Sequence, residues 1–215
     1  VMSGTSLDGA DAVVADFGNG TIAMRGFASV DYPATLRDEL LALNSSGFNE
    51  AERGATAANQ LARLYADAIG QALAKSGAKH EDIAAIGCHG QTIRHRPELG
   101  YTIQLNNAAL LAELTGCDVV SDFRVRDIAA GGQGAPLVPA FHDGVFRATD
   151  QTRVVVNVGG IANITILAPG APAWGFDCGP GNCLMDLWTA RHGRGLFDRD
   201  GAWSASGSVD HALLT

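Results

Sequence analysis

The sequence predicts an α/β fold with two domains. Strand-like and helix-like segments alternate along the 215 residues, and a plan of strand, glycine-rich turn and strand occurs twice, at residues 1–17 and 153–167. A connector rich in Gly, Ala and Pro, at residues 124–139, separates the two copies. We therefore expect a hinge between residues 124 and 150, a first domain over residues 1–145 and a second over residues 146–215.

Turn signals and hydrophobic periodicity predict the elements of the first domain. Two strands, at residues 11–17 and 21–30, should be joined by the turn Gly18-Asn19-Gly20. Pro33 should open a helix, and a longer helix should run from about Glu50 to Lys75 and end at Gly77. The further expected elements are a strand at 83–88, a strand at 101–105, a helix at 108–115 and a strand at 118–120.

In the second domain we expect strands at residues 153–158 and 161–167 around the turn Gly159-Gly160. A further strand should end at residues 175–177, and a helix should start near Gly181-Asn182. Residues 212–215 read as the middle of an apolar helix, and the chain begins directly against a loop. We therefore expect the chain to be a piece of a longer protein.

Composition narrows the possible partners. The net charge of −8 argues against nucleic acid as the main partner. No apolar run reaches transmembrane length and no signal peptide opens the chain, so we expect a cytoplasmic protein without a membrane partner. The four cysteines lack CxxC spacing and are expected to be buried, reduced thiols. A zinc site from Cys88, His89, Cys178 and Cys183 is the alternative, without the usual paired spacing.

The stretch from Met2 to Asp11 has the composition of a polyphosphate-binding loop. Its glycines let backbone N–H groups approach anionic oxygens, its hydroxyls donate hydrogen bonds, and Asp8 could hold a hydrated divalent metal. It lacks the lysine of the GxxxxGK[ST] pattern. An ordinary Gly/Asp-rich hairpin turn is the competing interpretation.

Asp177 is the best candidate for a general base, because it ends an apolar strand and precedes a glycine-rich segment that leads into a helix. Its carboxylate could then point into a cleft. The alternative is an Asp that caps this helix, although Asn182 is better placed to do so.

Two further polar clusters could bind a sugar. The first cluster contains His89, Gln91 and Thr92, which directly follow a strand and offer donors and acceptors to a sugar or amide. Gln104 and Asn106 end the neighbouring strand and could line the same side of the site. A structural role for His89 is the alternative. On an extended segment Arg124 and Arg126 would point the same way and could clamp a carboxylate. A surface salt-bridge cluster would explain these arginines equally well.

Taken together, five motifs resemble the anhydro-N-acetylmuramic acid kinase family, and the resemblance covers essentially the whole chain. The motifs are Met2-Ser3-Gly4-Thr5-Ser6-Leu7-Asp8-Gly9, His89-Gly90-Gln91-Thr92, Asp122-Phe123-Arg124, Gly131-Gly132-Gln133-Gly134-Ala135-Pro136-Leu137-Val138-Pro139 and Gly175-Phe176-Asp177-Cys178-Gly179-Pro180-Gly181-Asn182. The resemblance implies the fold of sugar kinases, actin and heat-shock chaperone ATPases: two ribonuclease-H-like domains with an ATP cleft between them. It also implies an ATP-dependent enzyme that opens the 1,6-anhydro ring of anhydro-N-acetylmuramic acid and phosphorylates O6, in the cytoplasmic recycling of peptidoglycan.

The resemblance also assigns residue roles. A first ATP loop would comprise Gly4, Thr5, Ser6, Leu7, Asp8, Gly9, Ala10 and Asp11, and a second Gly159 and Gly160. Asp8 would lie near Mg²⁺, and Asp177 would activate the attacking water. The sugar side would be lined by His89, Gln91, Thr92, Arg124 and Arg126. A homodimer is implied, and since the family's C-terminal segment is missing, we expect the 215 residues alone not to turn over.

Two other functions stay open on the sequence. An N-acetylhexosamine kinase of the same fold would share the phosphate loops but need no water-activating base. A non-catalytic ATP-binding module, such as a chaperone-like or sugar-sensing ATPase, would bind nucleotide without phosphorylating a sugar.

Overall fold

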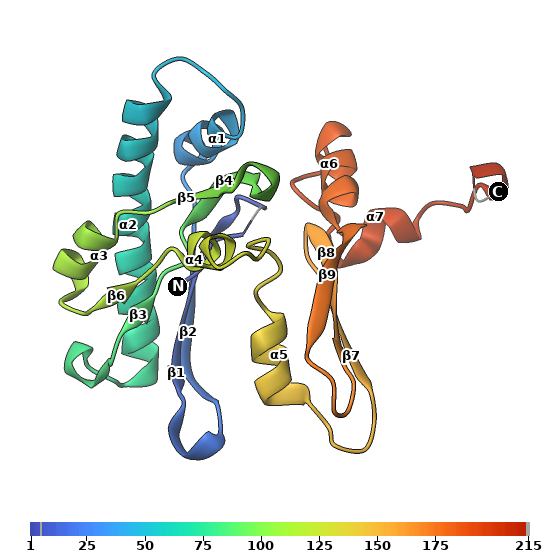
Figure 1. The fold of residues 1–215 in the computed structure, drawn as a ribbon. Coiled ribbons are helices and arrows are strands. Elements are labelled where there is room, and N and C mark those ends of the chain that lie inside the picture. Colours follow the sequence, from blue (N-terminus) through green and yellow to red (C-terminus); the bar gives the residue numbers. More distant parts are fainter. Residues whose placement is uncertain (5, 214–215) are drawn as a thin grey trace. The chain divides into compact units, whose positions relative to one another are not determined.

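The computed structural model describes residues 1–4 and 6–213, which form two compact units of mixed α/β structure that divide between Gly134 and Ala135 (Figure 1). The division falls inside the interval expected for the hinge and before the expected domain boundary at 145/146. Helix α5 (Pro139–Phe146) belongs to the second unit because it packs on strand β8 (Ile161–Leu167), where His142 Nδ1 lies 2.9 Å from Thr165 Oγ1. The mixed α/β class is confirmed, whereas the ribonuclease-H-like assignment stays a prediction.

The N-terminal residues join two strand pairs of the first unit, β1–β2 and β3–β6, into one hydrogen-bonded series. β1 (Gly9–Asp16) and β2 (Ala23–Asp31) form the expected antiparallel hairpin, and β3 (Ile86–Gly87) runs parallel to β6 (Val119–Val120). Met2 exchanges two backbone hydrogen bonds with Asp11, of 2.9 and 2.8 Å. On the other side, the Val1 nitrogen donates to the Gly87 carbonyl at 2.7 Å, and the His89 N–H donates to the Val1 carbonyl at 3.1 Å. The resulting order is β2, β1, residues 1–3, β3, β6.

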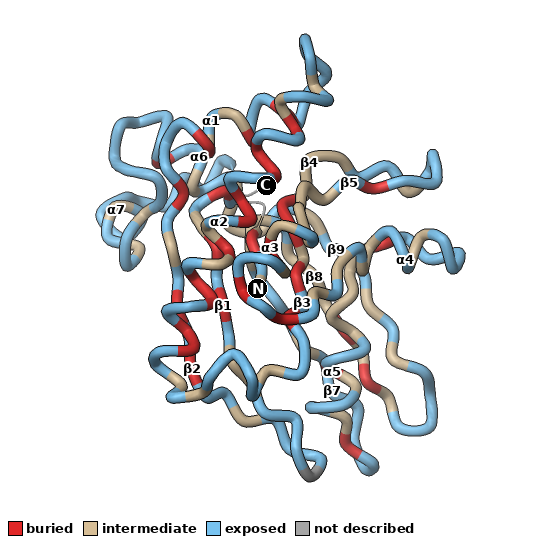
Figure 2. Tube along the Cα trace, turned by 90° about the vertical axis from the view of Figure 1, so that its left-hand side faces the viewer, coloured by how far each residue is buried: buried red, intermediate tan, exposed pale blue. Residues whose placement is uncertain are grey.

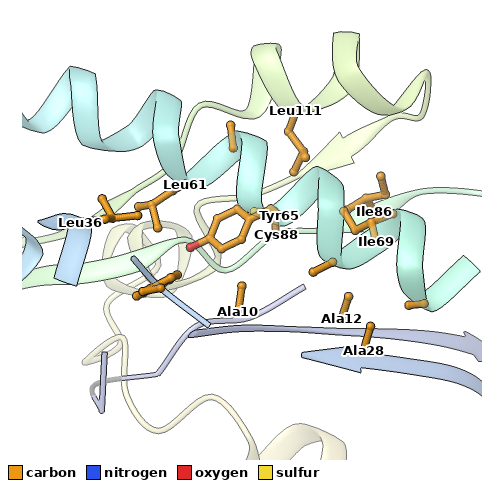
Figure 3. Packing of buried hydrophobic residues seen from close by; sticks show 14 of the residues in the cluster. Ala10, Ala12, Ala28, Leu36, Leu61, Tyr65, Ile69, Ile86, Cys88 and Leu111 are labelled. Carbon is orange, nitrogen blue, oxygen red and sulfur yellow. The ribbon is translucent and has the colours of Figure 1, made fainter. Parts of the chain in front are cut away.

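Helix α2 (Glu50–Ser76) supplies more residues to the core of this unit than any other element. Its buried residues Leu61, Tyr65, Ala68 and Ala72 recur at helical spacing. The helix packs against β1 and β2 (Figures 2 and 3). Glutamates in its first turn suit the helix dipole, and Gly77 ends it in the left-handed conformation, as expected. The expected helices α1 (Ala34–Leu43) and α3 (Ala108–Thr115) also form.

Two elements of the first unit were not expected. β4 (Gln91–Arg96) pairs with β5 (Tyr101–Leu105), and α4 (Phe123–Ala129) lies where a connector was expected. β4 has the sequence Gln-Thr-Ile-Arg-His-Arg, which contains a single apolar residue and therefore shows no apolar alternation. It forms through its pairing with the β5 backbone. α4 has only two turns and no side-chain cap, so it carries no start signal.

The second unit contains a three-stranded antiparallel sheet in the order β7 (Arg153–Val158), β8, β9 (Trp174–Pro180). The expected hairpin at Gly159-Gly160 is confirmed, and β9 extends beyond the expected end at Asp177. α6 (Cys183–Arg191) and α7 (Ala202–Ala205) follow. Of the helix expected at residues 212–215, the described part is a 3-10 turn over His211–Leu213, and the last two residues lie outside the described part. The other 3-10 turns are Gly18–Gly20, His80–Asp82, Pro97–Leu99 and Arg199–Gly201.

The cysteines agree in part with expectation. Cys88 and Cys117 are buried, Cys183 is half-buried and Cys178 is exposed, and all four are free thiols. Among the described residues, no group of three or more His, Cys, Asp or Glu side chains could hold a metal ion, so the zinc alternative gains no support. Within residues 1–4 and 6–213, every helix is too short or too polar to span a bilayer.

The packing of α2 predicts the effect of truncating one core side chain. Leu61 is fully buried, so Leu61→Ala should lower the free energy of unfolding by about 2–5 kcal/mol. Leu41 on α1 is 62% exposed, and Leu41→Ala should change it by less than about 0.5 kcal/mol. Urea unfolding followed by circular dichroism measures both; equal effects would contradict this core.

Candidate active site

The expected phosphate loop ran from Gly4 to Asp11, but Gly9, Ala10 and Asp11 lie in β1, so the residues before this strand are called loop 4–8. Leu7 fixes the loop: its side chain is buried, its φ is +54°, and its N–H donates to the Gly4 carbonyl at 3.3 Å. Ala10 is fully buried, so its side chain belongs to the core. Ser6 and Asp8 are exposed, and Thr5 lies outside the described residues.

The Asp8 carboxylate is oriented by its neighbours. Its Oδ1 accepts from the Ser6 hydroxyl at 2.7 Å and from the Gly9 N–H at 3.0 Å, while the Asp8 carbonyl accepts from the Tyr32 N–H at 3.0 Å. Mg²⁺ usually keeps several waters and needs one or two protein carboxylates. An exposed, oriented carboxylate fits that requirement, so Asp8 could hold a hydrated Mg²⁺.

A buried polar network lies behind the start of this loop. The Ser3 Oγ lies 2.8 Å from the Tyr65 hydroxyl and donates to the Gly90 carbonyl at 3.1 Å. The Gln91 Nε2 donates to the Gly4 carbonyl at 3.1 Å, and the Tyr32 hydroxyl donates to Gln91 Oε1 at 3.4 Å. Burial raises the pKa of both tyrosines above the usual value, so both hydroxyls stay protonated.

His89 and Arg124 form a second network. The Arg124 Nε donates to His89 Nε2 at 2.8 Å, and its Nη1 donates to the Gly134 carbonyl at 2.7 Å. His89 Nδ1 lies 2.7 Å from the Gly90 carbonyl, so the proton of the neutral ring belongs on Nδ1. Burial and the neighbouring Arg124 lower the pKa of His89, which keeps the ring neutral and able to accept.

The expected clamp of two parallel arginines is wrong. It assumed an extended segment, but Arg124 and Arg126 lie on helix α4, where residues two apart point in nearly opposite directions. Arg124 is half-buried against His89, whereas Arg126 is exposed.

The β4–β5 hairpin and the residue after it carry the expected polar groups Thr92, Gln104 and Asn106, and add Arg94, which was not expected. Thr92 Oγ1 accepts from Gln104 Nε2 at 3.2 Å, and Arg94 Nη2 lies 3.2 Å from Glu50 Oε2. Within the described residues, Arg94 Nε, Gln104 Oε1 and Asn106 Nδ2 are buried atoms without a hydrogen-bond partner. Such atoms call for water or a polar ligand. An arginine inside a strand is the signal that could have identified Arg94, but this signal depends on recognising β4, which was not expected.

In the second unit, Gly159 and Gly160 form the turn between β7 and β8. The Gly159 carbonyl accepts from the Asn182 N–H and the Gly160 carbonyl from the Gly181 N–H, both at 2.8 Å. C=O and N–H of a trans peptide point in opposite directions, so the N–H groups of Gly160 and Ile161 face away from the start of α6. Backbone N–H groups with that orientation can meet an anion.

Asp177 lies exposed on β9, opposite Asn163 of β8. A bulge next to this pair leaves Cys178 without a partner on β8, and bulges often re-aim side chains beside active sites. Asn157, Asn163 and Asp177 form one row across the three strands. Asn163 Oδ1 is another buried oxygen that lacks a partner within the described part of the chain. Since Asn182 is the residue before α6 and Asp177 lies within β9, the capping alternative for Asp177 gains no support.

The candidate residues therefore fall into two sets. The first unit holds loop 4–8, the Ser3–Gln91 network and the His89–Arg124 pair, and the second holds the Gly159-Gly160 turn and Asp177.

Comparison with known proteins identifies relatives along the whole chain. The model of a family described as anhydro-N-acetylmuramic acid kinase matches residues 1–215. Proteins with that name are 57% identical in Variovorax paradoxus, 58% in Bordetella parapertussis and 58% in Thiobacillus denitrificans, each alignment covering 100% of this chain. The chain spans 60%, 56% and 57% of the lengths of these three relatives. With a match that runs from its first residue to its last, the chain belongs to the anhydro-N-acetylmuramic acid kinase family.

Proposed function

We propose that this chain is the phosphate- and sugar-binding part of an ATP-dependent kinase. The enzyme would hydrolyse the 1,6-anhydro ring of 1,6-anhydro-N-acetylmuramic acid and phosphorylate O6 to give N-acetylmuramic acid 6-phosphate. The family match over residues 1–215 carries this proposal, because it includes every candidate site residue. Recycling of peptidoglycan in the cytoplasm, by a homodimer, is the setting proposed with it.

The repeated plan of the two units supports two domains of the same kind. In the first unit, residues 1–3, β1 and β2 precede helices, and in the second, β7, β8 and β9 precede α6. In both, the loop between the first two strands contains glycines. We propose two ribonuclease-H-like domains, in which loop 4–8 of the first and the Gly159-Gly160 turn of the second each bind phosphate groups of ATP.

The reaction balances with one water and one ATP. Water attacks C1 of the sugar and the C1–O6 bond breaks; Asp177 accepts the proton of the water. O6 then attacks the γ-phosphorus and ADP leaves. Because ring opening produces the nucleophile, hydrolysis and in-line phosphoryl transfer are coupled in one site. Mg²⁺, held through water by Asp8, would neutralise charge on the phosphates.

On the sugar side, Arg124 is the best candidate to bind the lactyl carboxylate. A guanidinium held by His89 and the Gly134 carbonyl is already oriented, so less side-chain entropy is lost when an anion binds. Thr92 and the unpartnered groups of the β4–β5 hairpin are proposed to meet the other polar groups of the sugar. Arg126 is exposed and would contribute only a longer-range charge.

Isotope labelling of the product tests the proposed reaction. The full-length protein, incubated with anhydro-sugar, ATP, Mg²⁺ and ¹⁸O-water, should give a 6-phosphorylated sugar labelled at C1. Asp177→Asn should lower turnover by about 10²–10⁴-fold or more, since it removes the general base. Asp150→Asn, a matched change at another exposed aspartate of the second unit, should leave turnover unchanged. An unlabelled product would exclude attack by water, and nucleotide binding without a sugar product would favour a non-catalytic module.

The His89–Arg124 contact predicts a pH dependence. The pKa of His89 is lowered in the folded protein, so the contact is complete at the ordinary value of about 6.5 and is lost only as the pH falls through the lowered pKa. A protonated His89 cannot accept from Arg124, and the charge of Arg124 opposes that extra charge. The KM for the sugar should therefore stay constant above pH 6.5 and rise as the pH falls through the lowered pKa of His89.

His89→Gln offers a check, because its amide oxygen can accept from Arg124 without titrating. Steady-state kinetics of the full-length protein should give a flatter pH profile of sugar KM for this variant. His211→Gln, at an exposed histidine, should keep the wild-type profile. If His89→Gln and the wild type showed the same rise, the contact would not control sugar binding.

A further inference from the structure

We propose that Gln91 is a positioning residue that holds the phosphate loop through the Gly4 carbonyl, rather than a contact of the sugar. This inference rests on the proposed function, because it assigns nucleotide binding to loop 4–8.

The side-chain amide of Gln91 is fully engaged inside the protein. The residue is 1% exposed. Its Nε2 donates to the Gly4 carbonyl at 3.1 Å and to the Thr92 carbonyl at 3.3 Å, which accounts for both N–H bonds. Its Oε1 accepts from the Tyr32 hydroxyl at 3.4 Å. A ligand would have to displace these buried bonds to reach the amide.

The backbone around Gln91 is built to place this amide behind the loop. Gly90 has a φ of +75°, and a Cβ at that position would lie 2.7 Å from the Leu105 carbonyl oxygen. The Gly90 carbonyl in turn accepts from the Ser3 hydroxyl at 3.1 Å. The segment Gly90-Gln91 is thus bonded to two consecutive residues, Ser3 and Gly4, at the start of the loop.

The other end of the loop is anchored separately. The buried side chain of Leu7 and its hydrogen bond to the Gly4 carbonyl close the turn. The Gly4 carbonyl therefore accepts both from Leu7 within the loop and from Gln91 outside it. With both ends fixed, Ser6 and Asp8 are the exposed polar side chains that the described part of the loop presents.

Loss of the hydrogen bond from Gln91 to Gly4 should therefore affect nucleotide binding and sugar binding to different extents. Donors held in place before the substrate binds need no reorganisation in the transition state. Loss of the Gln91–Gly4 bond should therefore weaken nucleotide binding and phosphoryl transfer, whereas a sugar contact would affect sugar binding first.

The test compares Gln91→Met, Gln91→Glu and the control Gln71→Met in the full-length protein. Gln71 lies exposed on α2, where its amide reaches Asp67, so this control removes an amide without touching the loop. Gln91→Met keeps the size of the side chain but removes both N–H donors. We expect it to raise the KM for ATP by about 5- to 100-fold, the range for a lost buried hydrogen bond. The Kd of a non-hydrolysable ATP analogue in the presence of Mg²⁺, measured by titration calorimetry, should rise by a similar factor. Sugar KM should change by less than about twofold, and Gln71→Met should match the wild type.

Gln91→Glu adds a pH signature. When ionised, the new carboxylate has no proton to donate to the Gly4 carbonyl, and when protonated it has one. Its defect in nucleotide binding should therefore shrink as the pH falls from 8 to 6, whereas the defect of Gln91→Met should follow the wild-type pH dependence. A space-filling role for Gln91 predicts no such recovery and predicts that Gln91→Met binds nucleotide normally.

A rise in sugar KM with unchanged nucleotide affinity in Gln91→Met would overturn the proposal. If Gln91→Met does not fold, Ser3→Ala replaces it, because this change removes the neighbouring hydrogen bond to the Gly90 carbonyl. Ser3→Ala should also weaken nucleotide binding more than sugar binding, and a larger effect on sugar binding would again overturn the proposal. The proposed function fails independently: a wild-type protein that binds nucleotide but leaves the anhydro-sugar unchanged refutes the reaction, while the calorimetric comparison still tests Gln91.

Discussion

The hydrogen bond from the Gln91 amide to the Gly4 carbonyl is the constraint on which the first unit's candidate site depends. It lies in a buried network that also contains Ser3, Tyr32 and Tyr65. Tyr65 belongs to α2, which supplies the largest share of the core (Figure 3), so Ser3, directly before the loop, is hydrogen-bonded to this helix. A buried polar network holds one arrangement only when its members are satisfied, so losing any one partner should loosen the loop.

In both units a glycine-containing loop is held by hydrogen bonds to its carbonyl groups, but the donors differ between the units. In the first unit a glutamine side chain reaches Gly4, and in the second the backbone N–H groups of Gly181 and Asn182 reach the turn. A Cβ on Gly181 would collide with the Gly159 carbonyl, so this approach requires glycine. The duplicated plan is therefore a duplication of backbone layout, and each copy has its own means of fixing the loop.

The sequence predicts the elements that have strong local signals, and it misses those whose conformation depends on tertiary contacts. The β1–β2 hairpin, α2 with its terminal Gly77, and the β7–β8 turn follow from turn residues and periodicity. β4 was missed because its polar side chains carry no strand pattern, and the helical α4 reversed the expected geometry of the arginines. Nothing local to Gln91 reveals that it is buried, because its partners Gly4 and Tyr32 are 87 and 59 positions away in the sequence.

A crystal structure of the full-length protein with Mg²⁺ and a non-hydrolysable ATP analogue would test whether loop 4–8, held by Gln91, binds the phosphates. We expect phosphate oxygens within about 3 Å of the N–H or hydroxyl groups of loop 4–8, with the Gln91 amide still hydrogen-bonded to the Gly4 carbonyl. Phosphates bound away from this loop, or a Gln91 side chain turned out to contact the ligand, would contradict it.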